Sequence, residues 1–229
     1  MPALAAAGYR VLAPDLYGRG YSDRVPGPYD LDLFVDQIDQ FLTALNIRQP
    51  VDLVGLSMGG YVVGGYAARH PERVRRVALL APQSIAISSD PSMGVVTLPI
   101  FGDYLFTVLI APFFIADSSQ EFTTGVEPEE WTARYREVMQ YRGFRRAMLS
   151  TLRTMTGDPF EQYTRLGQLG LPVLLLWGDD DRTIPFANAV KVQAAIPQAE
   201  LHPVANARHA FAYERPEVVN PLLLEFLIH

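Results

Sequence analysis

The chain has 229 residues, of which 49% are hydrophobic and 19% are charged, and its formal net charge is −6. The high apolar content excludes intrinsic disorder, and the acidic balance argues against wrapping a nucleic-acid backbone. The sequence contains no cysteine, which excludes disulfide bonds, thiolate metal sites and a cysteine nucleophile. A chain of this length suits one globular domain with a full core and room for an insertion.

The first third of the chain alternates between short apolar runs and segments of helical periodicity. Residues 9–14 are predicted to form a strand, and residues 31–45 repeat apolar side chains at the spacing of an amphipathic helix. A second strand is predicted at 51–55, followed by a helix at 61–69 and a third strand at 74–80.

The last third of the chain shows the same alternation. A predicted strand at 172–177 is apolar at every position, as expected for a strand that is covered on both faces. A helix at 186–195, a short strand at 200–204 and a closing helix at 218–227 follow. Because helices separate the strands, the sequence predicts an α/β fold with a mostly parallel sheet and helices on both faces.

The alternation of strands and helices stops in the middle of the chain. We therefore expect a first part of the core at 1–82, a helical cap inserted at 83–160, and a second part of the core at 161–229. The inserted segment ends in an aromatic- and arginine-rich stretch, 129–155, that is predicted to be helical.

An apolar stretch at 95–116 lies within this insertion. Pro99, Gly102 and Pro112 would break a membrane-spanning helix and Asp103 would charge its middle, so we expect a lid rather than a span. Contact of this stretch with a membrane surface stays an alternative. The first residues of the chain lack the basic start and long apolar run of a secretory signal, so the expected location is cytoplasmic.

The segment Gly55–Gly60 (GLSMGG) follows a predicted strand and opens a predicted helix. A sharp turn of this kind holds its serine, Ser57, in a strained conformation with the hydroxyl above the sheet edge. The N–H of Met58 then faces the place where a carbonyl oxygen becomes negative. The strand and the helix pass very close to each other at such a turn, so small neighbouring residues are required. We expect Gly55, Gly59, Gly60 and Gly64 to provide this space.

A glycine-rich turn of this kind can also simply pack tightly, without any chemistry, and that alternative stays open. A phosphate-binding turn is disfavoured because the sequence has neither a G-x-G-x-x-G motif nor a Gly-Lys-Ser/Thr ending at this place. The sequence before and after the turn therefore favours a nucleophilic serine over a phosphate site.

A serine hydroxyl needs a base to take its proton, and the chain has four histidines. We predict His209 as the base, because it lies in the loop after the last predicted strand, at the sheet edge where open α/β sheets place their ligands. The other three are expected to be structural: His70 ends a helix, His202 lies within a strand, and His229 is the last residue.

Three aspartates, Asp179, Asp180 and Asp181, follow the strand at 172–177. One of them should orient the imidazole of His209 and stabilise its charged form. We predict Asp181 for this role, with Asp179 as the alternative. A cation site made by the three carboxylates would need further ligands at suitable spacing, and the sequence does not show them. Another place for such an acid would be the loop after the third predicted strand. Residues 81–84 (APQS) in that loop contain no acid, so no rival candidate lies there.

These segments together resemble the α/β-hydrolase fold family, in particular its lidded, single-domain, esterase-like members. Residues 8–23 resemble the family's strand and loop before the nucleophile elbow, and 56–60 resemble the elbow itself. Residues 175–185 resemble the acid loop, and His209 with 214–217 resembles the histidine loop. The match covers the chain except for the insertion.

The resemblance implies a role for several acidic residues. The last acid of the acid loop, Asp181, corresponds to the acid of the family's catalytic triad, and the chain order Ser57, Asp181, His209 is the order of that triad. Asp15 and Asp23 correspond to residues that order a loop and take no part in the chemistry.

The chain departs from the family pattern in two places. Relatives begin with further strands and a His-Gly loop that supplies a second oxyanion donor, and no segment of this chain matches that loop. By the family pattern one strand is lacking between those containing Val11 and Val54, so a gap, an altered pairing or an exposed edge is expected. The loss of one oxyanion donor lowers turnover by about 100- to 1,000-fold. The second departure is Arg208, which stands where relatives often have glycine.

The expected function is a serine hydrolase that cleaves a small apolar carboxylic ester, or a related acyl substrate, through an acyl-enzyme without a metal or an organic cofactor. An apolar substrate is inferred from the aromatic side chains of the lid: Phe101, Tyr104, Phe106, Phe113 and Phe114. Thioester, amide and carbon–carbon bond hydrolysis use the same triad and stay open, whereas Ser57 at the elbow argues against epoxide and haloalkane chemistry. The alternative is a catalytically impaired truncated form, or a non-catalytic binding relic, that lacks the second oxyanion donor.

Overall fold

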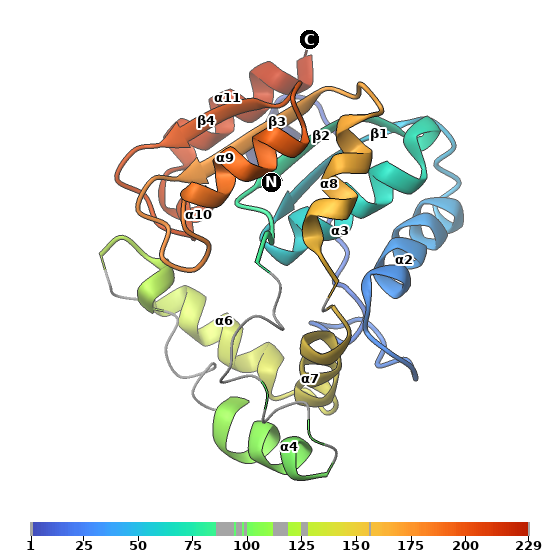
Figure 1. Cartoon of the computed structure of the whole chain (residues 1–229), viewed down its shortest axis with the longest axis vertical. Coiled ribbons are helices and arrows are strands. Elements are labelled where there is room, and N and C mark those ends of the chain that lie inside the picture. The colour runs from blue at the N-terminus through green and yellow to red at the C-terminus, as the bar shows by residue number, and fades with distance from the viewer. Residues whose placement is uncertain are drawn as a thin grey trace.

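A four-stranded parallel sheet forms the centre of the chain in the computed structural model, which describes residues 2–85, 94, 98, 100–111, 119–124, 128–155 and 157–228 (Figure 1). The strands stand in the order in which they occur in the sequence: β1 (Val51–Leu56), β2 (Val74–Leu80), β3 (Val173–Gly178) and β4 (Glu200–Val204). All three pairings are parallel, so the expected α/β architecture is confirmed. Every residue of β3 is buried, as its uniformly apolar sequence predicts.

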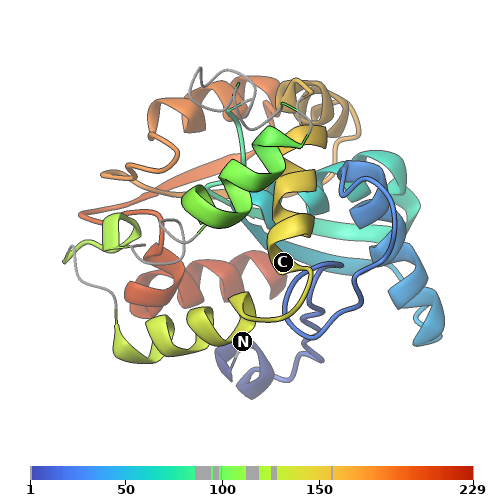
Figure 2. The ribbon, with the colours of Figure 1, turned by 90° about the horizontal axis from the view of Figure 1, so that it is seen from below.

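Helices cover both faces of this sheet. Four helices lie one beside the next on one face: α2 (Leu31–Ala44), α3 (Met58–Arg69), α8 (Pro159–Gly167) and α9 (Ala187–Ala195). The other face is covered by α11 (Pro216–Ile228), and α1 (Pro2–Ala6) packs against it (Figure 2). Two short elements complete the core, the 3-10 turn η1 (Pro71–Arg73) and α10 (Phe211–Glu214).

The start of α2 illustrates how the sequence sets an element boundary. The Asp30 side chain accepts a hydrogen bond from the Leu33 N–H at 3.0 Å, which satisfies one of the N–H groups that a helix start leaves free. The apolar face of the helix then packs on the core through Phe34 and Val35, which are almost fully buried.

The strand predicted at 9–14 is absent from the structure, so that prediction is wrong. Residues 9–14 have no regular secondary structure, and the backbone of 10–14 makes no hydrogen bond to the backbone of any other described residue. A strand requires a hydrogen-bonded neighbour, and β1, the edge strand of the described sheet, pairs only with β2. The free edge of β1, on which Val54 is 39% exposed, is one of the outcomes expected for this side of the sheet.

The described part of the segment between β2 and β3 is helical, as predicted. It contains α4 (Phe101–Tyr104), the π-helical turn η4 (Leu105–Ile110), the 3-10 turn η5 (Ser119–Glu121), α6 (Glu129–Met139) and α7 (Phe144–Thr154). The helices α4, α6 and α7 stand together beside the sheet layer in Figure 1. A small second core forms here around Phe106, Ala111 and Leu149.

The aromatic side chains of this segment divide into two groups. Phe106 is fully buried in this second core, whereas Phe101 and Tyr104 are more than half exposed. Phe113 and Phe114 lie outside the described residues. No helix in the described part of the chain has the length and the apolar character that crossing a membrane requires.

Candidate active site

The turn between β1 and α3 holds Ser57 in a strained backbone conformation. Ser57 has φ +53° and ψ −122°, a region that residues other than glycine rarely adopt. Its N–H donates to the Leu80 carbonyl at 2.9 Å, and its carbonyl accepts from the Gln83 N–H at 2.9 Å. These two hydrogen bonds hold the turn against the end of β2. Both would be lost if Ser57 relaxed to an ordinary backbone conformation, so they offset the free-energy cost of the strain.

A buried tyrosine supports the same turn from α8. The Tyr163 hydroxyl donates to the Gln83 carbonyl at 2.6 Å. Burial raises the pKa of Tyr163 well above its usual value, so the hydroxyl stays protonated and remains a donor.

The expected role of glycine is confirmed at two of four positions. A Cβ on Gly55 would lie 2.3 Å from the Gly59 carbonyl oxygen, and one on Gly60 would lie 2.8 Å from the Pro82 Cβ. Gly59 has no atom that a Cβ would meet within 4 Å, and at Gly64 the nearest atom, Tyr163 Cε1, is 3.5 Å away. The close passage of strand and helix therefore rests on Gly55 and Gly60.

Asp181 and His209 form a buried pair at the carboxyl ends of β3 and β4. The His209 Nδ1 lies 2.7 Å from the Asp181 Oδ2, and both side chains are almost completely buried. The other carboxylate oxygen of Asp181 accepts from the N–H groups of Thr183 at 2.9 Å and Ile184 at 2.8 Å. A carboxylate held in this way favours the tautomer with the proton on Nδ1 and leaves Nε2 free to accept a proton.

Glycine also allows the acid loop and the histidine loop to meet. A Cβ on Gly178 would lie 2.3 Å from the Ala207 carbonyl oxygen and 2.6 Å from that of Arg208. The two loops therefore approach backbone to backbone, which brings Asp181 and His209 together although 28 residues separate them in the sequence.

The two other aspartates of the acid loop have different partners. Asp179 accepts from the Ala207 N–H at 3.3 Å, and Asp180 pairs with Arg208 at 3.3 Å and with Arg182 at 3.5 Å. The hydrogen bond from Arg208 is the largest cause of the lowered pKa of Asp180. The structure thus pairs Asp181, and not the alternative Asp179, with His209.

Ser57 shares the sheet edge with this pair. It follows β1, whereas Asp181 follows β3 and His209 follows β4, and the carboxyl ends of parallel strands lie at one edge of a sheet. Among the described residues the Ser57 hydroxyl makes no hydrogen bond to His209, and such contacts often form only when a substrate is bound. Met58 begins α3, where the first N–H groups of a helix have no acceptor within the helix.

The remaining candidate residues have structural surroundings. His70 ends α3 and stacks on Tyr66 with 4.8 Å between the ring centres, and His202 is half-buried on β4. His229 lies outside the described residues. Asp15 orders its loop as expected, because it accepts from the Tyr21 N–H at 2.9 Å. In the part of the chain that the structure describes, no group of three or more His, Asp or Glu side chains could hold a metal ion.

Arg208 joins the histidine loop to the inserted segment. Besides its contact with Asp180, its guanidinium donates to the Phe122 carbonyl at 2.9 Å, and its side chain is only 13% exposed. The neighbouring Ala210 N–H donates to the Glu121 carbonyl at 2.9 Å. The sequence marks Arg208 as a departure from the family pattern, but its partner Phe122 is 86 residues away and could not be predicted from the pattern.

The comparison with protein families decides which family the chain belongs to. The protein-family model described as "alpha/beta hydrolase fold" matches residues 1–216 of the chain. The chain belongs to the α/β-hydrolase fold family. The four described strands, the turn at Ser57 and the Asp181–His209 pair are therefore the parts of a hydrolase fold.

Known members of the hydrolase fold match almost the whole chain. Non-heme chloroperoxidase CPO-A1 of Kitasatospora aureofaciens is 32% identical over 99% of this chain and 85% of its own length. A 2-hydroxy-6-oxononadienedioate/2-hydroxy-6-oxononatrienedioate hydrolase of Burkholderia vietnamiensis is 30% identical over 98% of this chain and 78% of its own length. The bromoperoxidase of Bacillus anthracis has the same fold, with a TM-score of 0.82 at 22% identity over 100% of this chain and 85% of that one.

Replacement of Arg208 by alanine is expected to lower the stability of this hydrolase fold by about 1–2 kcal/mol, because the Phe122 carbonyl loses a charged donor. The pKa of Asp180 should rise toward its usual value in the same variant, since its main hydrogen bond is gone. Urea denaturation measures the first effect, and NMR titration of the Asp180 carboxyl measures the second.

Arg182→Ala is the matched control for Arg208→Ala. Arg182 contacts the same carboxylate, but its side chain is 56% exposed, and the hydrogen bond to the Phe122 carbonyl comes from Arg208 instead. Its loss should leave the midpoint of urea denaturation almost unchanged. Equal destabilisation by the two substitutions would contradict the role assigned to Arg208.

Proposed function

We propose that the chain is a serine hydrolase that cleaves a small apolar carboxylic ester through Ser57, His209 and Asp181. The observation that carries this proposal is the buried Asp181–His209 pair, with 2.7 Å between its atoms, at the same sheet edge as the strained turn of Ser57. Membership of the hydrolase fold family and the hydrolases among the relatives support it.

The proposed reaction passes through an acyl-enzyme. His209 Nε2 takes the proton of the Ser57 hydroxyl while Oγ attacks the carbonyl carbon of the ester. The oxygen that becomes negative lies against the Met58 N–H at the start of α3, where the helix dipole favours negative charge. When the tetrahedral intermediate collapses, the alcohol leaves with the proton from His209. A water molecule then gives its proton to His209 and attacks the acyl group, which releases the acid and restores Ser57.

Asp181 acts in this scheme through His209. Its carboxylate holds the imidazole by Nδ1 and stabilises the imidazolium that forms in each half of the reaction. The N–H groups of Thr183 and Ile184 fix the carboxylate, so the imidazole does not have to be reoriented between the two steps.

The chemical class of the substrate rests on weaker support than the triad. The apolar character of the inserted segment favours an uncharged acyl group. Phe106, which is fully buried, is one of the aromatic side chains of that segment. The names of the relatives extend the range of substrates to test, because they include hydrolases of 2-hydroxy-6-oxodienoates. A panel of p-nitrophenyl acetate, butyrate and octanoate, together with 2-hydroxy-6-oxo-6-phenylhexa-2,4-dienoate, separates ester from carbon–carbon bond hydrolysis.

Labelling with a fluorophosphonate tests the nucleophile directly, because this reagent reacts with an activated serine hydroxyl. We expect one phosphonylated peptide, containing Ser57, and a loss of labelling in Ser57→Ala and in His209→Gln. Folded protein that carries no label, or that is labelled at another serine, would contradict the proposal.

The same experiment distinguishes the alternative of a catalytically impaired or non-catalytic form. Met58 is the one oxyanion donor that we assign among the described residues, and one missing donor costs about 100- to 1,000-fold in turnover. Labelling of Ser57 without turnover of any substrate in the panel would favour an impaired enzyme. Neither labelling nor turnover would favour a binding protein.

A further inference from the structure

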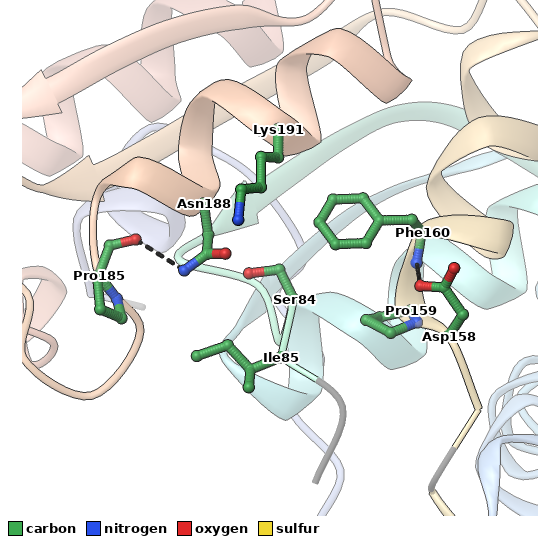
Figure 3. Close-up of a pocket in the computed structure, with 8 residues that line it drawn as sticks. All are labelled: Ser84, Ile85, Asp158, Pro159, Phe160, Pro185, Asn188 and Lys191. Carbon is green, nitrogen blue, oxygen red and sulfur yellow. Dashed lines mark hydrogen bonds between the residues drawn. The ribbon is translucent and has the colours of Figure 1, made fainter. Parts of the chain in front are cut away.

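A pocket lies outside the proposed catalytic residues. It has a volume of about 420 Å³ and opens between the end of β2, the start of α8 and the start of α9 (Figure 3). Eight of the described residues line it: Ser84, Ile85, Asp158, Pro159, Phe160, Pro185, Asn188 and Lys191. None of them belongs to the turn of Ser57 or to the Asp181–His209 pair, so the proposed reaction does not account for this pocket.

Ser84 presents an unused hydroxyl to this pocket. The residue is only 4% exposed, and its Oγ has no hydrogen-bond partner among the described residues. A buried hydroxyl without a partner costs free energy, and in native proteins such a group is uncommon unless it serves a purpose. In Figure 3 the Ser84 Oγ points toward Asn188, another residue of the pocket wall.

Lys191 places a positive charge beside this hydroxyl. It is the one lysine of the chain, whose other 18 basic residues are arginines. Among the described residues Lys191 makes no ion pair. Lys191 is exposed, and Figure 3 shows its ammonium group directed toward Asn188. A cation and a hydroxyl donor thus converge on one end of the pocket.

Asn188 and the helix start add to the polar end. The amide nitrogen of Asn188 donates to the Pro185 carbonyl at 3.1 Å, which leaves its Oδ1 on the side of Ser84. Lys191 and Asn188 lie in the first turns of α9, whose N-terminal backbone N–H groups carry partial positive charge. The positive charge at this end of the pocket therefore comes from Lys191 and the start of α9, whereas Asn188 Oδ1 is an acceptor.

The rest of the pocket is apolar and ends at a carboxylate. The ring of Phe160 lies between Lys191 and Asp158 in Figure 3, with Ile85 and Pro159 on the neighbouring walls. Asp158 uses one oxygen to accept from the Phe160 N–H at 3.0 Å. Its charge therefore repels a second negative group at the far end of a ligand.

We propose that this pocket binds a small monocarboxylate with a flat apolar body. The carboxylate contacts the Lys191 ammonium and accepts from the Ser84 hydroxyl, while the body lies against Phe160 and Ile85. One cation without a guanidinium fork suits a single negative charge better than a phosphate. This binding site is independent of the proposed esterase activity, because no step of it uses Ser57 or His209.

The single lysine makes a selective NMR experiment possible. Reductive methylation with ¹³C-formaldehyde labels Lys191 and the N-terminal amine and keeps both charges. During titration with benzoate we expect the Lys191 methyl resonance to move to saturation while the resonance of the N-terminal amine stays in place. The neutral isostere benzamide should produce no shift, and terephthalate, a dicarboxylate, should bind more weakly than benzoate because of Asp158.

Substitutions test the two groups that carry the proposal. Calorimetric titration of the unmethylated protein should show benzoate binding weakened about tenfold or more in Lys191→Met, and about three- to tenfold in Ser84→Ala. Arg165→Met removes a charge of the same sign from α8, at a residue outside the pocket, and should leave the dissociation constant unchanged. Ser84→Ala should fold normally, since the hydroxyl makes no bond.

Two results would overturn the inference. One is equal movement of both methylamine resonances with benzoate, which indicates general ion pairing. The other is an unchanged dissociation constant in both Lys191→Met and Ser84→Ala. Ser57→Ala should bind benzoate as the parent protein does, so this test and the test of the proposed function can fail separately.

Discussion

Replacement of Ser57 by alanine is expected to lower kcat for a p-nitrophenyl ester by about four to six orders of magnitude. The reason is that no other group can form the acyl-enzyme, so only uncatalysed attack by water at the oxyanion site remains. Steady-state kinetics of the purified variant measure this loss, and circular dichroism with urea denaturation shows whether the fold is intact.

The combination of Ser57→Ala with His209→Gln provides a sharper test. Groups that act as one unit have strongly non-additive effects, so the double variant should be no slower than either single variant. His202→Gln is the matched control, because His202 is half-buried on β4 away from the pair and should keep full activity. Multiplication of the two single effects in the double variant would show that Ser57 and His209 do not act together.

Substitution of Gly55 by alanine should destabilise the protein by about 2–4 kcal/mol and remove activity. The added Cβ would lie 2.3 Å from the Gly59 carbonyl oxygen, which is a backbone atom and cannot rotate away. Relief of this contact requires β1 and α3 to move apart, and such a movement displaces Ser57. The midpoint of urea denaturation measures the loss, with an unchanged m-value as the sign that two-state unfolding is kept.

Gly64→Ala, in the same glycine-rich segment, should change the stability in the opposite direction to Gly55→Ala. Gly64 lies inside α3, and its added Cβ would make an ordinary contact of 3.5 Å with Tyr163. Alanine is favoured over glycine in a helix interior, so stability should increase by about 0.5–1 kcal/mol. Destabilisation of similar size by both substitutions would show that the close passage of β1 and α3 is not specific to Gly55.

Local sequence patterns predicted most of the described core. The strands at 74–80 and 200–204 have the predicted bounds, and the apolar run at 172–177 differs from β3 by one residue at each end. These runs are short, apolar and bounded by turn residues, and in such segments burial of the side chains and the local propensity favour the same structure.

The segment at 9–14 shows where this reasoning fails. Its short, mostly apolar run is typical of a strand, but a strand exists only when a neighbour accepts and donates its hydrogen bonds. The described sheet ends at β1, so residues 9–14 have no partner in it. Pairing depends on elements far away in the sequence, and no local pattern contains that information.

The candidate site also has a part that the local sequence predicts and a part that depends on contacts between distant residues. The pattern GLSMGG is local, because strain at one serine and the space around it depend on adjacent residues, and so Ser57 could be found without coordinates. The resemblance of residues 175–185 to an acid loop predicts Asp181 among the three consecutive aspartates, but the contact itself is not local. It depends on the approach of two loops at Gly178, which brings Asp181 and no other acid of that loop against His209.

Composition, periodicity and the turn motif were thus sufficient to predict most of the helices and strands, their α/β order and the strained serine, because each of these depends on residues that are close together in the sequence. Only the folded chain shows the 2.7 Å contact between Asp181 and His209, the link from Arg208 to Phe122, and the placement of Lys191 and Ser84 in one pocket. The first two contacts join residues that are 28 and 86 positions apart, and the pocket joins the ends of separate elements. Only packing in three dimensions brings such residues together.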